Sequence, residues 1–188
     1  MSDVTDAIEE SFVELLKTKP YKSISVKEIC AHAHVSRNAF YAHFRDKRAI
    51  VTKLFRQHAL NPFIQAIDLL SPEVAYQMSN VVFARFYQGI YDNREYYENL
   101  VAPMCGVDPT FELVVARSLY APFMKLLKKR GFSGPEYEAE MLAHHFAASQ
   151  GVFLEKWISD KCEVPVSEVA RIYSLIISGC WEKIFDLK

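Results

Sequence analysis

The sequence predicts an all-α protein in which an N-terminal three-helix helix-turn-helix domain is followed by a larger helical domain. Apolar residues recur with helical spacing through most of the 188 residues, and no segment keeps the alternation of a half-buried strand. Residues 24–47 also carry the capping signals of two short helices joined by a tight turn. We place the two domains over residues 1–45 and 46–188.

The first helix is expected over residues 5–18, where Ile8 and Phe12 begin an apolar stripe with helical spacing. The second helix begins just after Ser25, because Ser25 and Glu28 have the spacing of a capping box, in which each side chain binds a backbone amide at the helix start. These two helices form the first half of the predicted domain.

The third helix is the one that shows polar groups to its surroundings. Ser36 can cap it, and Phe40 and Phe44, one turn apart, form its apolar side. The remaining surface carries hydrogen-bonding and small side chains, namely Arg37, Asn38, Ala39, Tyr41 and His43. A short capped helix with such a surface suits the floor of a DNA major groove.

The second domain is expected to consist of helices only. Asp46 caps a connector helix over residues 46–70 that Pro62 kinks, and Pro122 bends a helix over 110–130 that Gly131 ends. Further helices are expected over 71–90, 94–101, 135–158 and 167–185.

Positive charge is concentrated near the N-terminus. Residues 15–58 contain ten Lys and Arg residues against two acidic ones, a net charge of +8, whereas the whole chain carries −1. A segregated patch of this kind indicates a polyanionic partner for the N-terminal domain alone. A merely solvated charged face is the alternative.

Residues 25–47 closely resemble the helix-turn-helix of TetR/AcrR-family transcriptional regulators. The Val35-Ser36 pair, the run from Phe40 to Phe44 and the Asp46-Lys47 pair match the family pattern position by position. The resemblance implies a DNA-binding regulator, most often a repressor, whose second domain binds a ligand and forms a homodimer. In the turn the family usually has Gly, where this chain has His34; if the turn needs a positive φ, His is a strained substitute.

The resemblance also implies which residues contact double-stranded DNA. Lys47 matches the family's phosphate-binding lysine, and Ser25, Tyr41 and His43 match further backbone contacts. Arg37 and Asn38 stand where such proteins contact base edges. The full set of expected DNA-binding residues is Ser25, Ser36, Arg37, Asn38, Ala39, Tyr41, His43 and Lys47.

The C-terminal part resembles a TetR subgroup that includes regulators of dihydroxyacetone utilisation, through residues 93–97 and 146–158. The final helix is apolar around most of its circumference, so one side of it is expected to be buried beyond its own core. The resemblance implies that the last two helices form a four-helix bundle with those of a second copy. A single well-buried core helix is the alternative. Dimerisation would place two recognition helices on a palindromic operator about one helical turn apart.

Aromatic side chains are frequent in the C-terminal part and predict a pocket for an unknown small-molecule effector. The candidates for its lining are Phe86, Tyr87, Tyr97 and His145, and the alternative is a core packed with large side chains. An effector there would tilt the 46–70 helix and so change the spacing of the recognition helices.

Other function classes find little support in the sequence. It has no phosphate-binding loop, nucleophile elbow or zinc-protease motif, so we expect neither an enzyme nor a cofactor, and His144-His145 cannot place both rings on one helix face to bind a metal. The four cysteines lack C-x-x-C spacing and no apolar run could span a membrane, so a cytoplasmic location is expected. A TetR-like co-regulator acting through a protein partner, without direct DNA binding, is the alternative function.

Overall fold

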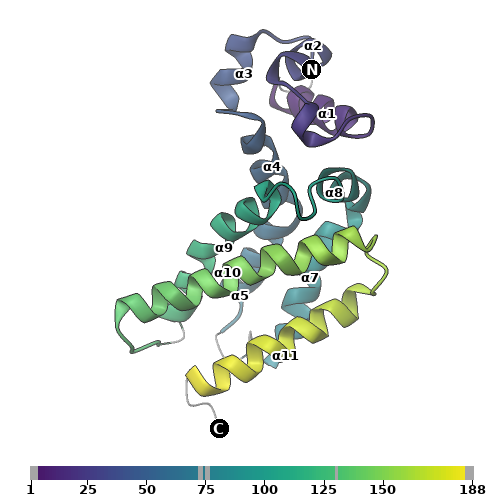
Figure 1. Ribbon diagram of the computed structural model, residues 1–188. Coiled ribbons are helices and arrows are strands. Elements are labelled where there is room, and N and C mark those ends of the chain that lie inside the picture. Colours follow the sequence, from purple (N-terminus) through teal and green to yellow (C-terminus); the bar gives the residue numbers. More distant parts are fainter. Residues whose placement is uncertain (1–3, 72–73, 75–76, 130, 185–188) are drawn as a thin grey trace.

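The computed structural model describes residues 4–71, 74, 77–129 and 131–184, and within these residues every regular element is helical (Figure 1). The predicted all-α class is confirmed. The elements are α1 (Val4–Leu16), the 3-10 helix η1 (Tyr21–Ser23), α2 (Val26–His32), α3 (Arg37–His43), α4 (Lys47–Phe55), the π-helical segment η2 (Arg56–Leu60), α5 (Asn61–Leu69), α7 (Ser79–Asp92), α8 (Arg94–Val101), α9 (Thr110–Lys129), α10 (Glu136–Ser159) and α11 (Val166–Ile184).

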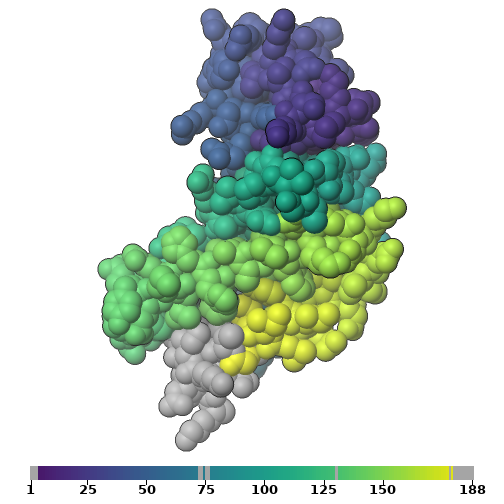
Figure 2. All heavy atoms as spheres, in the orientation of Figure 1, coloured from purple at the N-terminus to yellow at the C-terminus, as the bar shows by residue number. Residues whose placement is uncertain are grey.

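The N-terminal lobe is held together by apolar side chains from α1, α2, α3 and α4. Phe12, Ile29, Phe40 and Ile50, one from each helix, have no exposed surface. Figure 2 shows this lobe resting on α8 and the beginning of α9, and α1 contacts α8 directly. The N-terminal lobe, which contains α3, is therefore attached to the rest of the molecule through both α4 and this contact.

The connector between the lobes is not one regular helix. The predicted kink takes the form of a π-helical turn, η2, in which the Asn61 N–H bonds to the Arg56 carbonyl five residues earlier. Pro62 follows and has no N–H to offer the His58 carbonyl. That carbonyl lies against Gly89 of α7, where a Cβ atom would come within 1.9 Å of the oxygen. The lobes are thus joined at an irregular turn whose backbone packs directly against Gly89 of α7.

In the C-terminal lobe α9 packs along α10 and α11 packs along α7 (Figure 1). Three predicted helices, over 94–101, 110–130 and 135–158, are found almost as expected, and Gly131 ends α9 with a φ of 76°. The predicted start of a helix at Ser71-Pro72 lies largely outside the described residues, and α7 is described from Ser79. No helix in the described part of the chain is long and apolar enough to cross a membrane.

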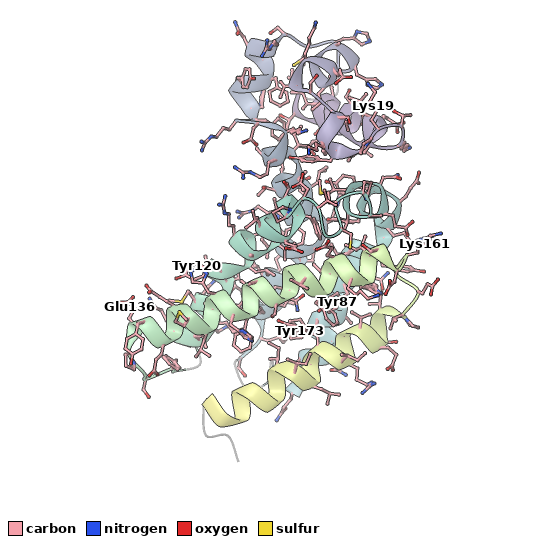
Figure 3. The ribbon with its side chains drawn as sticks, viewed as in Figure 1. Lys19, Tyr87, Tyr120, Glu136, Lys161 and Tyr173 are labelled. Atoms are coloured by element: carbon pink, nitrogen blue, oxygen red, sulfur yellow. The ribbon has the colours of Figure 1, made fainter. Side chains whose placement is uncertain are left out.

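Aromatic rings fill the centre of the C-terminal lobe. Tyr87 and Tyr173, labelled in Figure 3 between α10 and α11, have ring centroids 6.3 Å apart, and Trp157 lies 5.7 Å from Tyr87. The buried Tyr87 hydroxyl donates to the Gln150 Oε1 at 3.1 Å. The hydrogen bond lowers the cost of burying these polar groups in an otherwise apolar core.

Two carboxyl groups meet at a close approach of α9 and α10. A Cβ atom on Gly151 would lie 3.0 Å from the Glu112 backbone, so a larger residue would fit only if the two helices moved apart by a few tenths of an ångström. One turn along α10, Glu155 is hydrogen-bonded to Glu112 and accepts the Gly106 N–H at 3.1 Å. The hydrogen bond to Glu155, then burial and the Glu155 charge, raise the pKa of Glu112 to about 7. The pKa of Glu155 is lowered, chiefly by the hydrogen bond with Glu112.

This pair predicts a loss of stability in the neutral range. Glu112 titrates near 4.5 when unfolded and near 7 when folded, so its stabilising contribution is complete below about pH 4.5 and is lost as the pH rises through 7. Glu112→Gln should remove this decline, because the Gln side chain has nearly the same shape as Glu and does not titrate. Chemical denaturation at pH 5, 6, 7 and 8 measures it, with exposed Glu140→Gln as control. The same decline in Glu112→Gln as in the unmodified protein would exclude this carboxyl as its source.

Candidate DNA-binding site

The recognition helix α3 is fixed at its start and on one side. The Ser36 Oγ accepts the Ala39 N–H at 3.0 Å, which satisfies one of the free amides of the first turn. Phe40 is fully buried, while Arg37 and Asn38 are exposed next to the cap. The structure therefore places the two expected base-contacting side chains together on the outer surface of the N-terminal lobe.

The turn before α3 requires the left-handed conformation. His34 has a φ of 55°, the Val35 N–H bonds to the Cys30 carbonyl at 3.0 Å, and the His34 N–H approaches the Ala31 carbonyl at 3.4 Å. This is the Schellman arrangement, in which Gly is the preferred residue at the position of His34. The turn does use a positive φ, and His34 adopts it without the conformational freedom of Gly.

Ser25 and Glu28 form the predicted capping box at the start of α2. The Ser25 Oγ accepts the Glu28 N–H at 3.2 Å, and the Glu28 Oε2 accepts the Ser25 N–H at 2.9 Å. Lys19 also binds Glu28, and this contact, with the hydrogen bonds from Ser25, lowers the pKa of Glu28 to about 2. Because the Ser25 hydroxyl donates to the same carboxylate at 2.8 Å, its proton is already engaged within the protein.

The other expected contacts from α3 differ in how freely they reach solvent. Tyr41 is half exposed, and the Arg37 guanidinium lies 6.0 Å from the centre of its ring. Ala39 is half-buried behind the cap. The His43 Nδ1 is 3.2 Å from the Thr5 Oγ1 of α1, so this exposed ring is also held against the first helix.

Lys47 has a different environment from the one expected of a phosphate-binding residue. Its Nζ donates to the carbonyls of Tyr21 at 2.7 Å, Ile24 at 2.8 Å and Lys22 at 3.4 Å, and lies 4.2 Å from the centre of the Tyr21 ring. An ammonium group has three N–H donors, and these carbonyls occupy all of them. Burial lowers the pKa of this ammonium. These bonds tie Lys47 at the start of α4 to η1 and the residue after it.

We therefore expect Lys47→Met to act on folding more than on DNA. The substitution keeps an unbranched apolar stem but leaves three carbonyl groups without their charged donor, which should cost about 1.5–3 kcal/mol of unfolding free energy. The salt dependence of DNA binding should stay unchanged. Urea denaturation and a salt titration on DNA measure the two effects, and a salt slope lowered by about one would return Lys47 to the phosphate contacts.

Residues 11–54 match the profile of the bacterial regulatory proteins of the tetR family. The matched segment runs from the middle of α1 to the end of α4 and contains the capping box, the Schellman turn and α3. The N-terminal domain belongs to the TetR family. Its fold thus agrees with the resemblance noted in the sequence, and the comparison with curated proteins returned no match.

Solved structures share the fold over nearly the whole chain. The dihydroxyacetone kinase operon activator DhaS covers 96% of both chains with 19% identity and a TM-score of 0.55. The fatty acid degradation regulator FadR from Bacillus halodurans covers 95% of this chain and 96% of its own, with 13% identity and a TM-score of 0.61. The TetR-family repressor AlkX from a Dietzia strain covers 96% of both chains, with 14% identity and a TM-score of 0.59. The whole chain therefore has the fold of a TetR-family transcriptional regulator.

Further cations surround this TetR-family recognition helix. Arg45 follows α3 and Arg48 lies in the first turn of α4, both beside a surface hollow that they line with Arg56. They were counted in the basic patch but not predicted as contacts, because their direction depends on how α4 leaves the domain. Arg48 lies 3.8 Å from the Asp46 carboxylate, and three more cations of the patch are paired within the protein, namely Lys17 with Glu14, Lys19 with Glu28 and Lys53 with Glu9. Among the described residues, Arg37 at the start of α3 and Arg45 just after its end have no ion pair.

The expected pocket residues do not surround one cavity. Phe86, Tyr87 and Tyr97 are buried in the core, and the Tyr97 hydroxyl lies 3.2 Å from the His58 Nδ1. His145 is exposed on α10. The three aromatic side chains thus fit the alternative of a densely packed core, and His145 is not grouped with them. Among the described residues no cluster of three His, Cys, Asp or Glu side chains could hold a metal ion.

Proposed function

We propose that the protein is a ligand-responsive transcriptional repressor that binds a palindromic operator in the cytoplasm as a homodimer. The observation that carries this proposal is the capped, exposed start of α3, where Arg37 and Asn38 stand free on the outer surface of a TetR-family domain. Arg favours guanine and Asn favours adenine when either contact is bidentate. Arg45 and Arg48 beside α3 supply charge for the phosphates.

The last two helices supply the dimer interface of this proposal. They leave large apolar side chains exposed on one face each, with Met141 69% and Leu175 62% exposed. On α10 the apolar positions Tyr137, Met141 and Val152 follow one helical face, as do Ile172, Leu175 and Ile176 on α11. A monomer would leave this surface in water, and a second copy of the same two helices covers it as a four-helix bundle.

A homodimer also accounts for the size of the reading surface. One recognition helix of seven residues can contact only a few base pairs. Two copies read two half-sites roughly 34–36 Å apart, and the two-fold axis of the dimer requires the half-sites to form an inverted repeat. This proposal therefore predicts the symmetry of the operator as well as its contacts.

Selection of bound sequences from a random DNA pool tests the proposal. The expected product is an inverted repeat whose half-sites are one helical turn apart. A reporter gene placed downstream of the selected site then shows whether the protein represses or activates transcription. Repression is expected, as for AlkX, which is described as a repressor; activation would match DhaS, which is described as an operon activator. Failure to enrich any sequence would favour a co-regulator that acts through a protein partner.

A further inference from the structure

A surface hollow of about 340 Å³ lies between the connector and α9, the helices labelled α5 and α9 in Figure 1. Its connector side begins in the π-helical turn with Arg56 and Leu60 and continues along α5. Its other side is α9 around Pro122. The volume lies at the lower end of the range for small-molecule sites. The hollow therefore has the size for a compact ligand and touches the turn that joins the two lobes.

The floor of the hollow is apolar. Leu60 and Ile67 from the connector are buried, and Ile64 between them is half-buried. Ala121 and Pro122 face them from α9. Water in contact with this floor has few hydrogen-bond partners, so a ligand with an apolar body gains free energy by displacing it.

The rim of the hollow is positively charged. Arg56 stands on the connector side, and Arg117 and Lys125 stand two turns apart on α9. The rim has one acidic residue, Asp68, whose carboxylate forms an ion pair with the Lys125 ammonium at 2.7 Å. Neither Arg56 nor Arg117 has an ion pair among the residues that the structure describes. Two guanidinium groups are therefore available to one ligand.

We propose that this hollow binds a small organic anion with an apolar body, such as an aromatic or aliphatic carboxylate, and that this anion is the effector. The apolar part would lie on Leu60, Ile67 and Pro122, and the carboxylate would bind Arg117 and Arg56 across the hollow. Guanidinium groups suit this role because they bind carboxylates in a planar, two-bonded geometry. The effector role rests on the proposed function, whereas the binding site stands on the hollow alone.

Binding here would act directly on the connector. Arg56 and Leu60 belong to the π-helical turn, and the end of α5 is tied to α9 because the Lys129 Nζ donates to the carbonyls of Ile67 at 3.1 Å and Leu70 at 3.0 Å. An anion that bridges Arg117 and Arg56 therefore changes the distance between α9 and the π-helical turn η2. The end of α5 stays bonded to α9 through Lys129. A ligand that favours one such arrangement shifts the position of the recognition helix.

Calorimetric titration of the full-length protein with 1-naphthoate tests the site. The expected result is saturable binding of 1-naphthoate and much weaker binding of naphthalene-1-methanol, which has the same rings without the charge. Arg117→Gln should weaken 1-naphthoate binding by about tenfold or more, because it removes a charge-assisted contact. Ala121→Trp should weaken it too, by filling the hollow from an exposed position. Arg85→Gln, at an exposed arginine of α7, is the matched control and should leave binding unchanged.

Equal affinity for the acid and the alcohol, or binding that neither hollow variant weakens, would overturn the site. A second titration measures operator affinity with and without 1-naphthoate, and a change of about 5–150-fold is expected for an effector. Binding at the hollow without any change in operator affinity would overturn the effector role. A protein that binds 1-naphthoate but no DNA would contradict the proposed function and leave the anion site established, so the two failures are distinguishable.

Discussion

Gly89→Ala is expected to destabilise the protein by about 2–5 kcal/mol, far more than an ordinary helix substitution. The added methyl group would lie 1.9 Å from the His58 carbonyl oxygen and 2.7 Å from its carbon. Both atoms belong to backbone, so no side chain can rotate away to relieve the contact. Either α7 must withdraw or the π-helical turn must rearrange, and both changes disturb the buried aromatic contacts between Phe55 and Phe86.

Thermal and urea denaturation measure this effect, and Gln88→Ala is the matched control. Gln88 is the preceding residue of α7 and is exposed, so its replacement should change the unfolding free energy by less than about 1 kcal/mol. A loss of similar size in both variants would show that α7 does not need Gly at this contact. An unfolding free energy unchanged by Gly89→Ala would contradict the short approach of α7 to the connector.

The second large effect is expected at the proposed dimer interface. Leu175→Glu places a charge on the exposed apolar face of α11, where a partner helix would bury it without a compensating group. The variant should remain folded, because Leu175 is exposed in the single chain, and should sediment as a monomer. Its affinity for a two-half-site operator should fall by about 100-fold or more, because each half-site is then bound independently.

Leu69→Glu is the control for this prediction. Leu69 is 85% exposed at the end of α5 and belongs to neither of the last two helices, so its replacement should leave both the dimer and operator binding intact. A Leu175→Glu protein that stays dimeric in analytical ultracentrifugation would place the interface elsewhere. A monomeric variant that keeps full operator affinity would instead contradict the need for two recognition helices.

Much of the N-terminal domain could be predicted because its signals are local. The Ser25–Glu28 capping box, the Ser36 cap and the left-handed His34 each depend on residues within one or two turns. The helix limits followed from the same signals, and the family resemblance rests on this segment. Local hydrogen bonding determines these features before any tertiary contact forms.

The features that depend on packing between distant segments were not predictable in the same way. The environment of Lys47 is set by η1, more than twenty residues earlier, so its family position suggested a phosphate contact where the structure shows bonds to carbonyls. Gly89 and the His58 carbonyl meet only because α7 crosses the connector. The aromatic content of the C-terminal lobe predicted a pocket near Tyr87, whereas the charged hollow around Arg117 is lined by residues of the connector and α9 and by none of the predicted pocket residues.

Binding of a recognition-helix variant to operator and to random DNA tests the central claim most directly. Fluorescence anisotropy with a selected operator should show that Arg37→Ala loses about 1–3 kcal/mol of binding free energy on the operator and much less on a scrambled duplex, because a base contact distinguishes sequences. Arg85→Ala, at an exposed position of α7, should bind both duplexes as the unmodified protein does. Equal losses on the two duplexes would make Arg37 a phosphate contact, and undiminished operator binding by Arg37→Ala would contradict the assignment of α3 as the reading helix.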